Sequence, residues 1–430
     1  MTIPAYGAET WAGFVAQSAW NTETSSGHDF LPCRPGGMKL VQKPTFSTQA
    51  RGFTKRHGRK TNESVEGTIP FDFYFVGLEK ILDEMFSRTS TEVASYVVTS
   101  ANDVIDFKED AGGTLNADVA DGSYTTTTYG AALKTALEAA GVGTYTITYS
   151  TSTKKFSVAV AGAASAVQFL GTGDGEALIG FAVASASAAS ITSDTAVASV
   201  YDHVYTPLDT GQHPNVYGLT LWDHKDLKTW ECLSAFVTAL TIGFEENAQF
   251  VTFSPTFVAA SRTRATSNTP TFGTAVPANP AGNLTITVTA TAGALTMEAT
   301  AFTVSITLPT TLKHSITSLT AKHASRGDRM VIEGSAAWEY TNEAIIDGWL
   351  DDWESGTAVN ISAVLTGSTL RGAIAESLTI GMPESFIGGD DPVSGGAGAM
   401  ELPFLWEAAY DYGNSAAALT LTLRNDTYLA

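Results

Sequence analysis

Apolar and polar residues alternate with a period of two along much of this chain. The alternation is clear in Thr285–Thr289 and Tyr145–Tyr149, where Thr residues alternate with Ile, Val or Tyr. A period of two places successive side chains on opposite faces of a strand, so these segments predict strands with one buried face. Leu78–Phe86 and Tyr129–Ala140 instead repeat their apolar residues at helical spacing. The chain is therefore predicted to be mainly β, of the α+β class.

One stretch of this pattern occurs twice. Val65–Phe73 matches Ile332–Tyr340, because in both segments Glu-Gly-Thr/Ser is followed, two residues later, by an aromatic, an acidic and a second aromatic residue. The alternation places Phe71 and Phe73 on one face of the first strand. Such self-similarity indicates a duplicated structural unit, and we refer to the two units as copy one and copy two.

An amphipathic helix follows this strand at the same distance in both copies. Leu78 lies twelve residues after Glu66, and Ile345 lies twelve residues after Glu333. Burial of each apolar anchor contributes roughly 1.5–3 kcal/mol, enough for the apolar stripe to hold the helix on a sheet. The charged residues of the first helix, including Glu79 and Glu84, are expected on its outer side. The expected core anchors are Phe71, Phe73, Leu78, Leu82 and Phe86 in copy one and Trp338, Tyr340, Ile345, Trp349 and Trp353 in copy two.

A second match closes each copy. Ala239–Glu246 resembles Ser377–Glu384, and each is followed by a further apolar strand. Arg51-Gly52 also corresponds to Arg326-Gly327 in the hairpin that precedes the Glu-Gly motif, although copy one then has eight extra residues. Matches in the same order, with a helix between strands, favour duplication over coincidence.

The two copies differ in what separates the helix from the closing strands. The separation is about 150 residues in copy one and about 25 in copy two, so copy one contains an insertion. Residues 97–200 are predicted to form a small α+β domain in a loop, where an insertion costs little entropy. The predicted domains are 1–95 with 201–262, including an irregular N-terminal arm 1–37 that packs either on a partner or on the chain's own core; the insertion 97–200; a linker 263–297, whose Leu284–Val288 is a candidate strand of copy two; and 298–430.

The overall charge argues against a nucleic-acid-binding protein. The chain has 24 Lys and Arg against 44 Asp and Glu, giving a net charge of −20. Its field repels polyanions, although such a protein could still surround DNA without holding it. The two cysteines, Cys33 and Cys232, are too few for a disulfide scaffold and are expected to be free thiols. No segment has the length and apolarity of a membrane span, and no signal peptide is evident.

Common catalytic motifs are absent from the sequence. The P-loop, nucleophile-elbow and zinc-protease motifs are absent, and the seven histidines have no metal-ligand spacing. Asp390-Asp391 is best interpreted as a solvated loop. No enzyme activity, cofactor or metal is expected; a glycan hydrolase would need a cleft with paired carboxylates.

One local cluster departs from the acidic average. It places five of the 24 cations within ten residues of a predicted hairpin. The hairpin is either a solvated tip or an arm of roughly 20 Å, at ~3.3 Å per residue, that pairs with carboxylates of an adjacent subunit. DNA contact is a weaker alternative because the remaining charge opposes it. The candidate inter-subunit residues are Arg51, Lys55, Arg56, Arg59 and Lys60.

With these features the chain resembles the tail tube (major tail) proteins of long-tailed phages. The resemblance is carried by Tyr6–Trp11, Gln17–Thr22, Val65–Asp72, Gly77–Leu82 and, in the insertion, Val104–Phe107. It implies β-sandwich domains with a flanking helix, joined through a continuous inner sheet into stacked rings. DNA would pass through the lumen without sequence-specific binding, and the arm at Arg51–Thr61 would bridge rings.

This resemblance also implies the partners. The usual ring has six tube domains, so three chains with two copies each would close a pseudo-hexamer; a homo-hexamer is the alternative. Other tail proteins would bind the ends, no membrane is involved, and assembly in the host cytoplasm would yield the virion tail. A capsid decoration or surface-binding module, with the inserted domain as the binder, is the alternative function.

Overall fold

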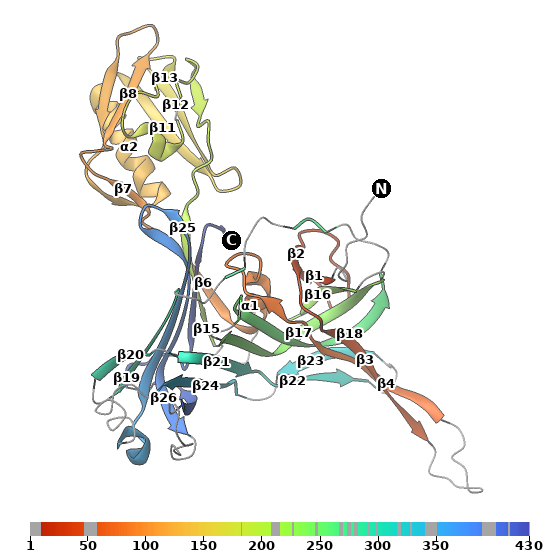
Figure 1. Cartoon of the computed structure of the whole chain (residues 1–430). Helices are drawn as coiled ribbons and strands as arrows, with labels where there is room; N and C mark the ends of the chain where they lie inside the picture. The colour runs from red at the N-terminus through yellow and green to blue at the C-terminus, as the bar shows by residue number, and fades with distance from the viewer. Residues whose placement is uncertain are drawn as a thin grey trace, which may run out of the picture. The chain divides into compact units, whose positions relative to one another are not determined.

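The computed structural model of the chain describes residues 10–46, 58–181, 183–207, 216–225, 228–245, 248–265, 270–272, 277–278, 283–290, 293–297, 299–315, 320–326, 329–339, 351–388, 401–411 and 413–429. The chain forms two compact units. Unit 1 consists of Met1–Thr89, Val204–Gly367 and Ser377–Thr422; unit 2 consists of Ser90–His203, Ser368–Glu376 and Leu423–Ala430. The protein is mainly β, as the alternation predicts (Figure 1).

Unit 1 contains the strands of both copies, the short helix α1 and a helical segment at residues 351–355. Those that precede the insertion are β1 (Thr10–Ala16), β2 (Asp29–Pro32), β3 (Gly37–Phe46), β4 (Gly58–Thr68), β5 (Phe71–Asp72), α1 (Glu79–Met85) and β6 (Ser87–Val93), which continues into unit 2. Those that follow it in copy one are β15 (Val200–Thr206), β16 (Leu219–Lys225), β17 (Lys228–Glu245) and β18 (Thr252–Arg264).

The strands of copy two begin inside the segment expected to be a linker. Leu284–Val288 lies in β19, which pairs with β20 and β25. Residues 284–297 therefore form a hairpin rather than a connector. The strands are β19 (Leu284–Ala290), β20 (Gly293–Met297), β21 (Ala299–Thr307), β22 (Thr310–His314), β23 (Ala321–Arg326), β24 (Val331–Glu339), β25 (Val359–Arg371), β26 (Ile374–Gly388), β27 (Glu401–Ala409) and β28 (Thr420–Asn425).

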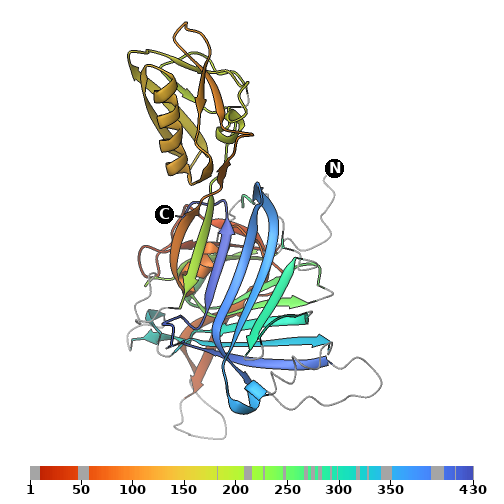
Figure 2. The ribbon, with the colours of Figure 1, turned by 90° about the vertical axis from the view of Figure 1, so that its left-hand side faces the viewer.

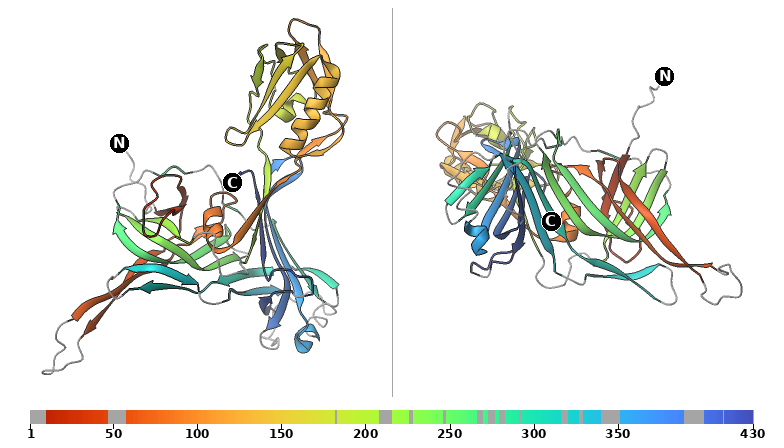
Figure 3. Two further views of the ribbon diagram at one scale, coloured as in Figure 1. Left: turned by 180° about the vertical axis from the view of Figure 1, so that it is seen from behind. Right: turned by 60° about the horizontal axis from the view of Figure 1, so that its bottom comes forward.

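Antiparallel ladders join the two copies in one sheet. Along the ladders the strands follow each other as β3, β4, β18, β17, β21, β24, β27 and β26. Figure 3 shows the green and teal strands of this sheet from behind and from below. One face carries the apolar residues of the alternation, and all of the following are buried: Leu240, Ile242, Phe244, Phe253, Phe257, Phe302, Val304, Ile306, Ile332, Phe404 and Trp406.

The ladders support the first sequence match. Gly67 on β4 pairs with Phe257 on β18, and Gly334 on β24 pairs with Trp406 on β27. The Glu-Gly-Thr/Ser motifs therefore occupy equivalent positions, and β18 is the counterpart of β27.

The second match is wrong in register. Thr256 of β18 pairs with Ala239, but its counterpart Leu405 pairs with Gly388 rather than with Ser377. Ser377 lies earlier on β26, outside the register of its ladder with β27. Short strands that alternate Thr with Leu or Ile resemble one another wherever they lie, so this pattern does not fix a register.

Helix α1 buries the predicted anchors together with two unexpected carboxylates. Leu78, Leu82 and Phe86 are almost completely buried, as expected. Glu79 and Glu84, expected on the outer side, are buried as well. Phe71 and Phe73 are also buried, whereas the side chain of Trp338 and all of Tyr340, Ile345 and Trp349 lie outside the described residues; Trp353 is half-buried.

The N-terminal segment is not the irregular arm that was predicted. β1 pairs with β16 over Thr10–Ala16 and with β2 over Trp11–Phe14, and Trp11 and Phe14 are buried. These two aromatic anchors thus belong to β1, and they dock on the chain's own core. Helical spacing and short alternation are hard to recognise in segments as brief as Asp29–Pro32.

Unit 2 contains the inserted segment with its own core. Its helix α2 (Thr126–Ala140) ends at Gly141 and packs against β11, as the predicted pattern requires (Figure 2). Tyr129, Leu133 and Leu137 lie in the core with Phe107 and Phe156. The remaining elements are β7 (Tyr96–Val98), β8 (Val104–Glu109), β9 (Leu115–Asp118), β10 (Gly122–Tyr124), β11 (Gly143–Ser150), β12 (Lys155–Gly162), β13 (Val167–Phe169), η1 (Glu176–Ile179) and β14 (Ser190–Thr192).

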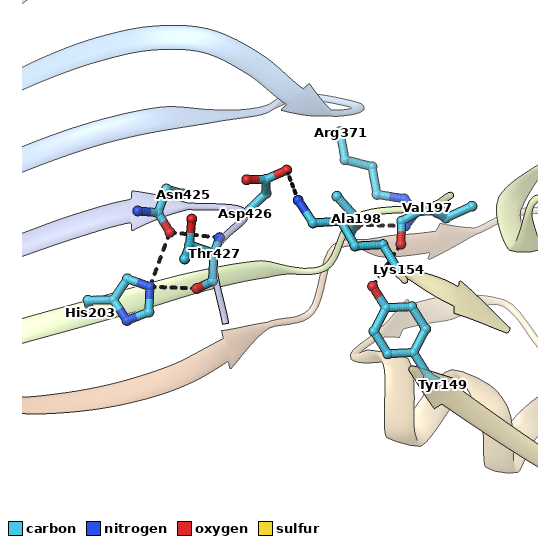
Figure 4. Close-up of polar contacts among 9 residues, drawn as sticks. All are labelled: Tyr149, Lys154, Val197, Ala198, His203, Arg371, Asn425, Asp426 and Thr427. Carbon is cyan, nitrogen blue, oxygen red and sulfur yellow. Dashed lines mark hydrogen bonds and ion pairs between the residues drawn. The ribbon is translucent and has the colours of Figure 1, made fainter. Parts of the chain in front are cut away.

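Two segments of copy two complete unit 2 (Figure 4). Arg371, at the tip of the β25–β26 hairpin, lies over the ring of Tyr96 at 3.5 Å from its centroid and donates a 2.6 Å hydrogen bond to the carbonyl of Leu178. Near the C-terminus, Asp426 forms an ion pair with Lys154 at 2.5 Å. The insertion therefore packs against segments that are distant in sequence: Arg371 donates a hydrogen bond to the carbonyl of Ala198, 173 residues earlier in the chain.

Candidate assembly surface

The two copies meet through a seven-residue ladder between β17 and β21. Ala239–Glu245 pairs antiparallel with Ala301–Thr307, in a register that sets Leu240 opposite Ile306 and Ile242 opposite Val304. These side chains are buried on the core face. Backbone hydrogen bonds and buried side chains together make this ladder, which we call the inter-copy junction, a continuous part of the sheet rather than a loose domain contact.

The opposite face of the sheet is polar across the same junction. It carries hydroxyl residues and glycine in adjacent pairs, such as Thr241 with Ser305 and Gly243 with Thr303. Moving outward from the junction, it adds further small polar residues on one side and acidic residues on the other. We call this surface the polar face; its described members are Thr68, Thr241, Gly243, Glu245, Thr252, Ser254, Thr256, Thr303, Ser305, Glu333, Ser335, Leu405 and Glu407.

Acidic side chains dominate the charge of the polar face. Glu333 and Glu407 lie directly opposite each other on β24 and β27, an arrangement that repels and is tolerated because both are exposed. Glu245 is exposed at the end of β17. Lys39 lies opposite Glu66 on the neighbouring β3–β4 ladder. The face therefore presents hydroxyls and negative charge, a combination that does not retain a polyanion.

An open hollow of about 580 Å³ lies over the copy-two part of this face. Thr303, Ser305, Glu333 and Ser335 line it, together with the exposed apolar side chains of Phe386 and Leu405. The hollow contains no group of titratable side chains close together beyond its glutamates. Among the described residues, no cluster of three or more His, Cys, Asp or Glu side chains could hold a metal ion.

A hairpin of copy two, which we call the second arm, packs on copy one. It consists of β22 and β23, and it contacts β4, β17 and β18. Arg326 at its base forms an ion pair with the buried Glu84 of α1 at 2.5 Å, and it donates a 3.0 Å hydrogen bond to the Glu84 carbonyl. The carbonyl of Ala321 accepts a 3.1 Å hydrogen bond from Trp20.

This ion pair is shielded from solvent. The side chain of Glu84 has no exposed surface and that of Arg326 is 12% exposed. Burial lowers the pKa of Arg326, while Glu84 acts in the opposite direction. A buried pair of this kind fixes how two elements align more than it adds to stability. It also explains why Glu84, expected to be solvated, is buried.

The corresponding hairpin of copy one, the first arm, is the distal part of β3 and β4. Every ladder of β3 in the described part of the chain is with β4, and Leu40 is exposed. Of the five candidate inter-subunit cations, Arg59 and Lys60 lie on β4, opposite Thr45 and Pro44. Arg51, Lys55 and Arg56 lie outside the described residues.

The sequence predicts a hairpin before the Glu-Gly motif in both copies but marks only the first as a contact arm. The second arm has no dense cluster of cations, so its sequence does not indicate that Arg326 forms a buried ion pair. Glu84 could have indicated the second arm. When another segment covers the polar side of an amphipathic helix, an acidic residue on that side is buried and pairs with a cation of the covering segment.

The two thiols are free, as expected. Burial raises the pKa of Cys33 to about 11 and that of Cys232 to about 12. Protonated thiols are poor nucleophiles, so neither residue has the character of a reactive cysteine. In the described residues, no helix is long and apolar enough to cross a membrane.

Comparison with known proteins identifies a family. A family model described as phage tail tube protein matches residues 7–408. The match covers copy one from residue 7, the insertion, and copy two as far as residue 408. No curated protein sequence matches the chain.

Proposed function

Because the chain belongs to the phage tail tube protein family, we propose that its two copies act as two tube domains and that three chains close a ring. Stacked rings would form the tube through which DNA reaches the host. In this arrangement residues 1–95 with 201–262 form the first tube domain, residues 284–430 form the second, and the insertion 97–200 decorates the tube. The chain would assemble with itself in the host cytoplasm and bind other tail proteins at the tube ends.

The observation that carries this proposal is the inter-copy junction. A ring of six equivalent positions needs the same contact six times, and each chain already contains one such contact between β17 and β21. Three further contacts, each between chains, would complete the ring. A head-to-tail contact of this kind closes into a ring when its rotation divides a full turn.

The edge available for the contact between chains is that of β3. Gly37, Met38 and Lys39 pair with Thr68, Gly67 and Glu66 of β4, just as Thr303, Val304 and Ser305 pair with Ser335, Gly334 and Glu333 of β24. β3 is therefore the counterpart of β21. The outer edge of β21 is occupied by β17, whereas β3 has no second ladder among the described residues, although the N–H of Met38 near its start donates a 2.9 Å hydrogen bond to the Asp223 carboxylate. An unpaired edge strand is a template for strand addition from another chain.

The polar face supports the role of a conduit. Continued around a ring, its hydroxyls and glutamates would line the lumen, and their negative potential would repel the DNA backbone so that DNA slides rather than binds. The apolar opposite face is already buried in the cores of the two copies. The polar face is thus the one suited to a water-filled channel.

Electron microscopy and mass measurement test the proposal. Purified chain is expected to form hollow tubes visible by negative staining, and rings released from them are expected to contain three chains by native mass spectrometry. Rings of six chains would refute the pseudo-hexamer, and a protein that stays monomeric at high concentration would refute tube assembly.

A further inference from the structure

The second arm provides a structural template for the first. Pro44 lies five residues beyond Lys39, and Thr310 lies five residues beyond its counterpart Ser305. The cross-strand partner of Pro44 is Lys60, and the cross-strand partner of Thr310 is Arg326. The ladders therefore place Lys60, rather than the sequence-matched Arg51, at the position equivalent to Arg326. Both positions hold a cation.

The partner of Arg326 also has a counterpart. Glu84 lies eighteen residues after Glu66, and Asp351 lies eighteen residues after Glu333. Both are acidic, and both follow the duplicated Glu-Gly motif into the helix of their copy. Residues 351–355 are described, and all five are helical.

The two acids differ in their surroundings in a way that the template explains. Glu84 is fully buried because the second arm lies on α1, whereas Asp351 is exposed. No described arm of the same chain covers Asp351, since the second arm is on copy one and the first arm belongs to copy one. In a ring, the first arm of the next chain would lie on copy two.

We propose that Lys60 of one chain forms an ion pair with Asp351 of the adjacent chain. The pair reproduces, between chains, the contact that Arg326 and Glu84 make within a chain. It rests on the proposed ring, and it assigns the base of the first arm to contacts inside a ring. Lys donates fewer hydrogen bonds than Arg, and the side chain of Asp is shorter than that of Glu. The pair between chains is therefore weaker than the Arg326–Glu84 pair.

Charge reversal tests the pair. Lys60→Glu and Asp351→Lys are each expected to reduce the assembled fraction about tenfold or more, because like charges would meet at every junction between chains. The chain carrying both substitutions is expected to assemble like the unmodified protein. Lys228→Glu is the matched control, since Lys228 is exposed at the start of β17, and it should leave assembly unchanged. Sedimentation of tubes measures the assembled fraction.

The outcomes separate the two proposals. If the unmodified chain forms tubes and Lys60→Glu assembles equally well, the ion pair is refuted and the ring is untouched. If both single variants fail and the double variant also fails, the pair is again refuted, provided circular dichroism shows all variants folded. If the unmodified chain forms no tubes, the proposed function itself has failed.

Discussion

The glycines of the duplicated motif are required by what lies beside them. A Cβ on Gly67 would lie 2.2 Å from the carbonyl oxygen of Gly37, and one on Gly334 would lie 2.1 Å from Cζ2 of Trp406. Neither position has room for a side chain. The motif Glu-Gly-Thr/Ser thus persists in both copies for a packing reason, although the obstacle is backbone in one copy and an indole ring in the other.

Gly334→Ala is expected to destabilise the protein by about 1–3 kcal/mol, because Trp406 must leave its position. Gly388→Ala on β26 is the matched control, since a Cβ there meets nothing within 4 Å. Urea denaturation followed by tryptophan fluorescence measures the difference. Equal midpoints for the two variants would show that Trp406 relaxes without cost.

His28 is expected to make stability depend on pH. Its ring centroid lies 3.5 Å from that of Trp222, and burial, aided by Lys80, lowers its pKa to about 4. The unfolded chain takes up this proton near pH 6.5, so the folded state binds fewer protons between pH 6.5 and 4. Stability is therefore complete above pH 6.5 and is lost as the pH falls towards 4.

Comparing the unmodified chain with His28→Phe at pH 7.5 and pH 5 isolates this contribution, because Phe retains the ring contact. The decrease in the free energy of unfolding between pH 7.5 and pH 5 is expected to be smaller in the variant by about 1–2 kcal/mol. This value is lower than for a fully buried histidine because the ring is partly exposed. An identical loss in both proteins would assign the acid sensitivity to carboxylates elsewhere.

At the scale of elements, the sequence predicted most where periodicity was long. The helix ending at Gly141 and the strands at Tyr145 and Lys155 lie where the pattern places them. It failed for Thr10–Ala16, because brief strands rich in small residues have little periodic signal, and for Ser377, because alternation cannot determine a register. Glu84 is buried by the second arm, whose Arg326 lies 242 residues further along the chain. No local sequence pattern around Glu84 could therefore predict its burial.

The tip of the first arm is expected to act between rings. Replacing Arg51, Lys55, Arg56 and Arg59 with Gln removes four positive charges and keeps Lys60 and the length of the hairpin. Rings should still form, while long tubes should be at least about tenfold rarer because the acidic surface of the next ring loses its partners. Negative-stain microscopy distinguishes rings from tubes. Normal tubes in this variant would show that the tip is only a solvated turn.

At the scale of the whole molecule, the insertion is separable from the sheet that joins the copies. Its core is its own, and its polar contacts with copy two use the hairpin tip at Arg371 and the C-terminal residues near Asp426. Since β6 pairs with β15, joining Val93 to Val200 through an Asn-Gly turn would make a hairpin. Tubes are expected to form without the insertion and to be thinner in micrographs; loss of tubes would make the insertion part of the ring contact.

The number of chains in a ring can also be tested by parity. Where two Lys60→Glu chains meet, or two Asp351→Lys chains meet, positions 60 and 351 carry like charges. Where a chain of one kind meets a chain of the other, these positions carry opposite charges. A ring with an even number of chains can alternate the two kinds and satisfy every contact. A ring of three chains cannot, since at least one contact must join two chains of the same kind. An equimolar mixture is therefore expected to remain poorly assembled when the double variant assembles well. Full recovery in the mixture would indicate an even number of chains and would exclude the three-chain ring.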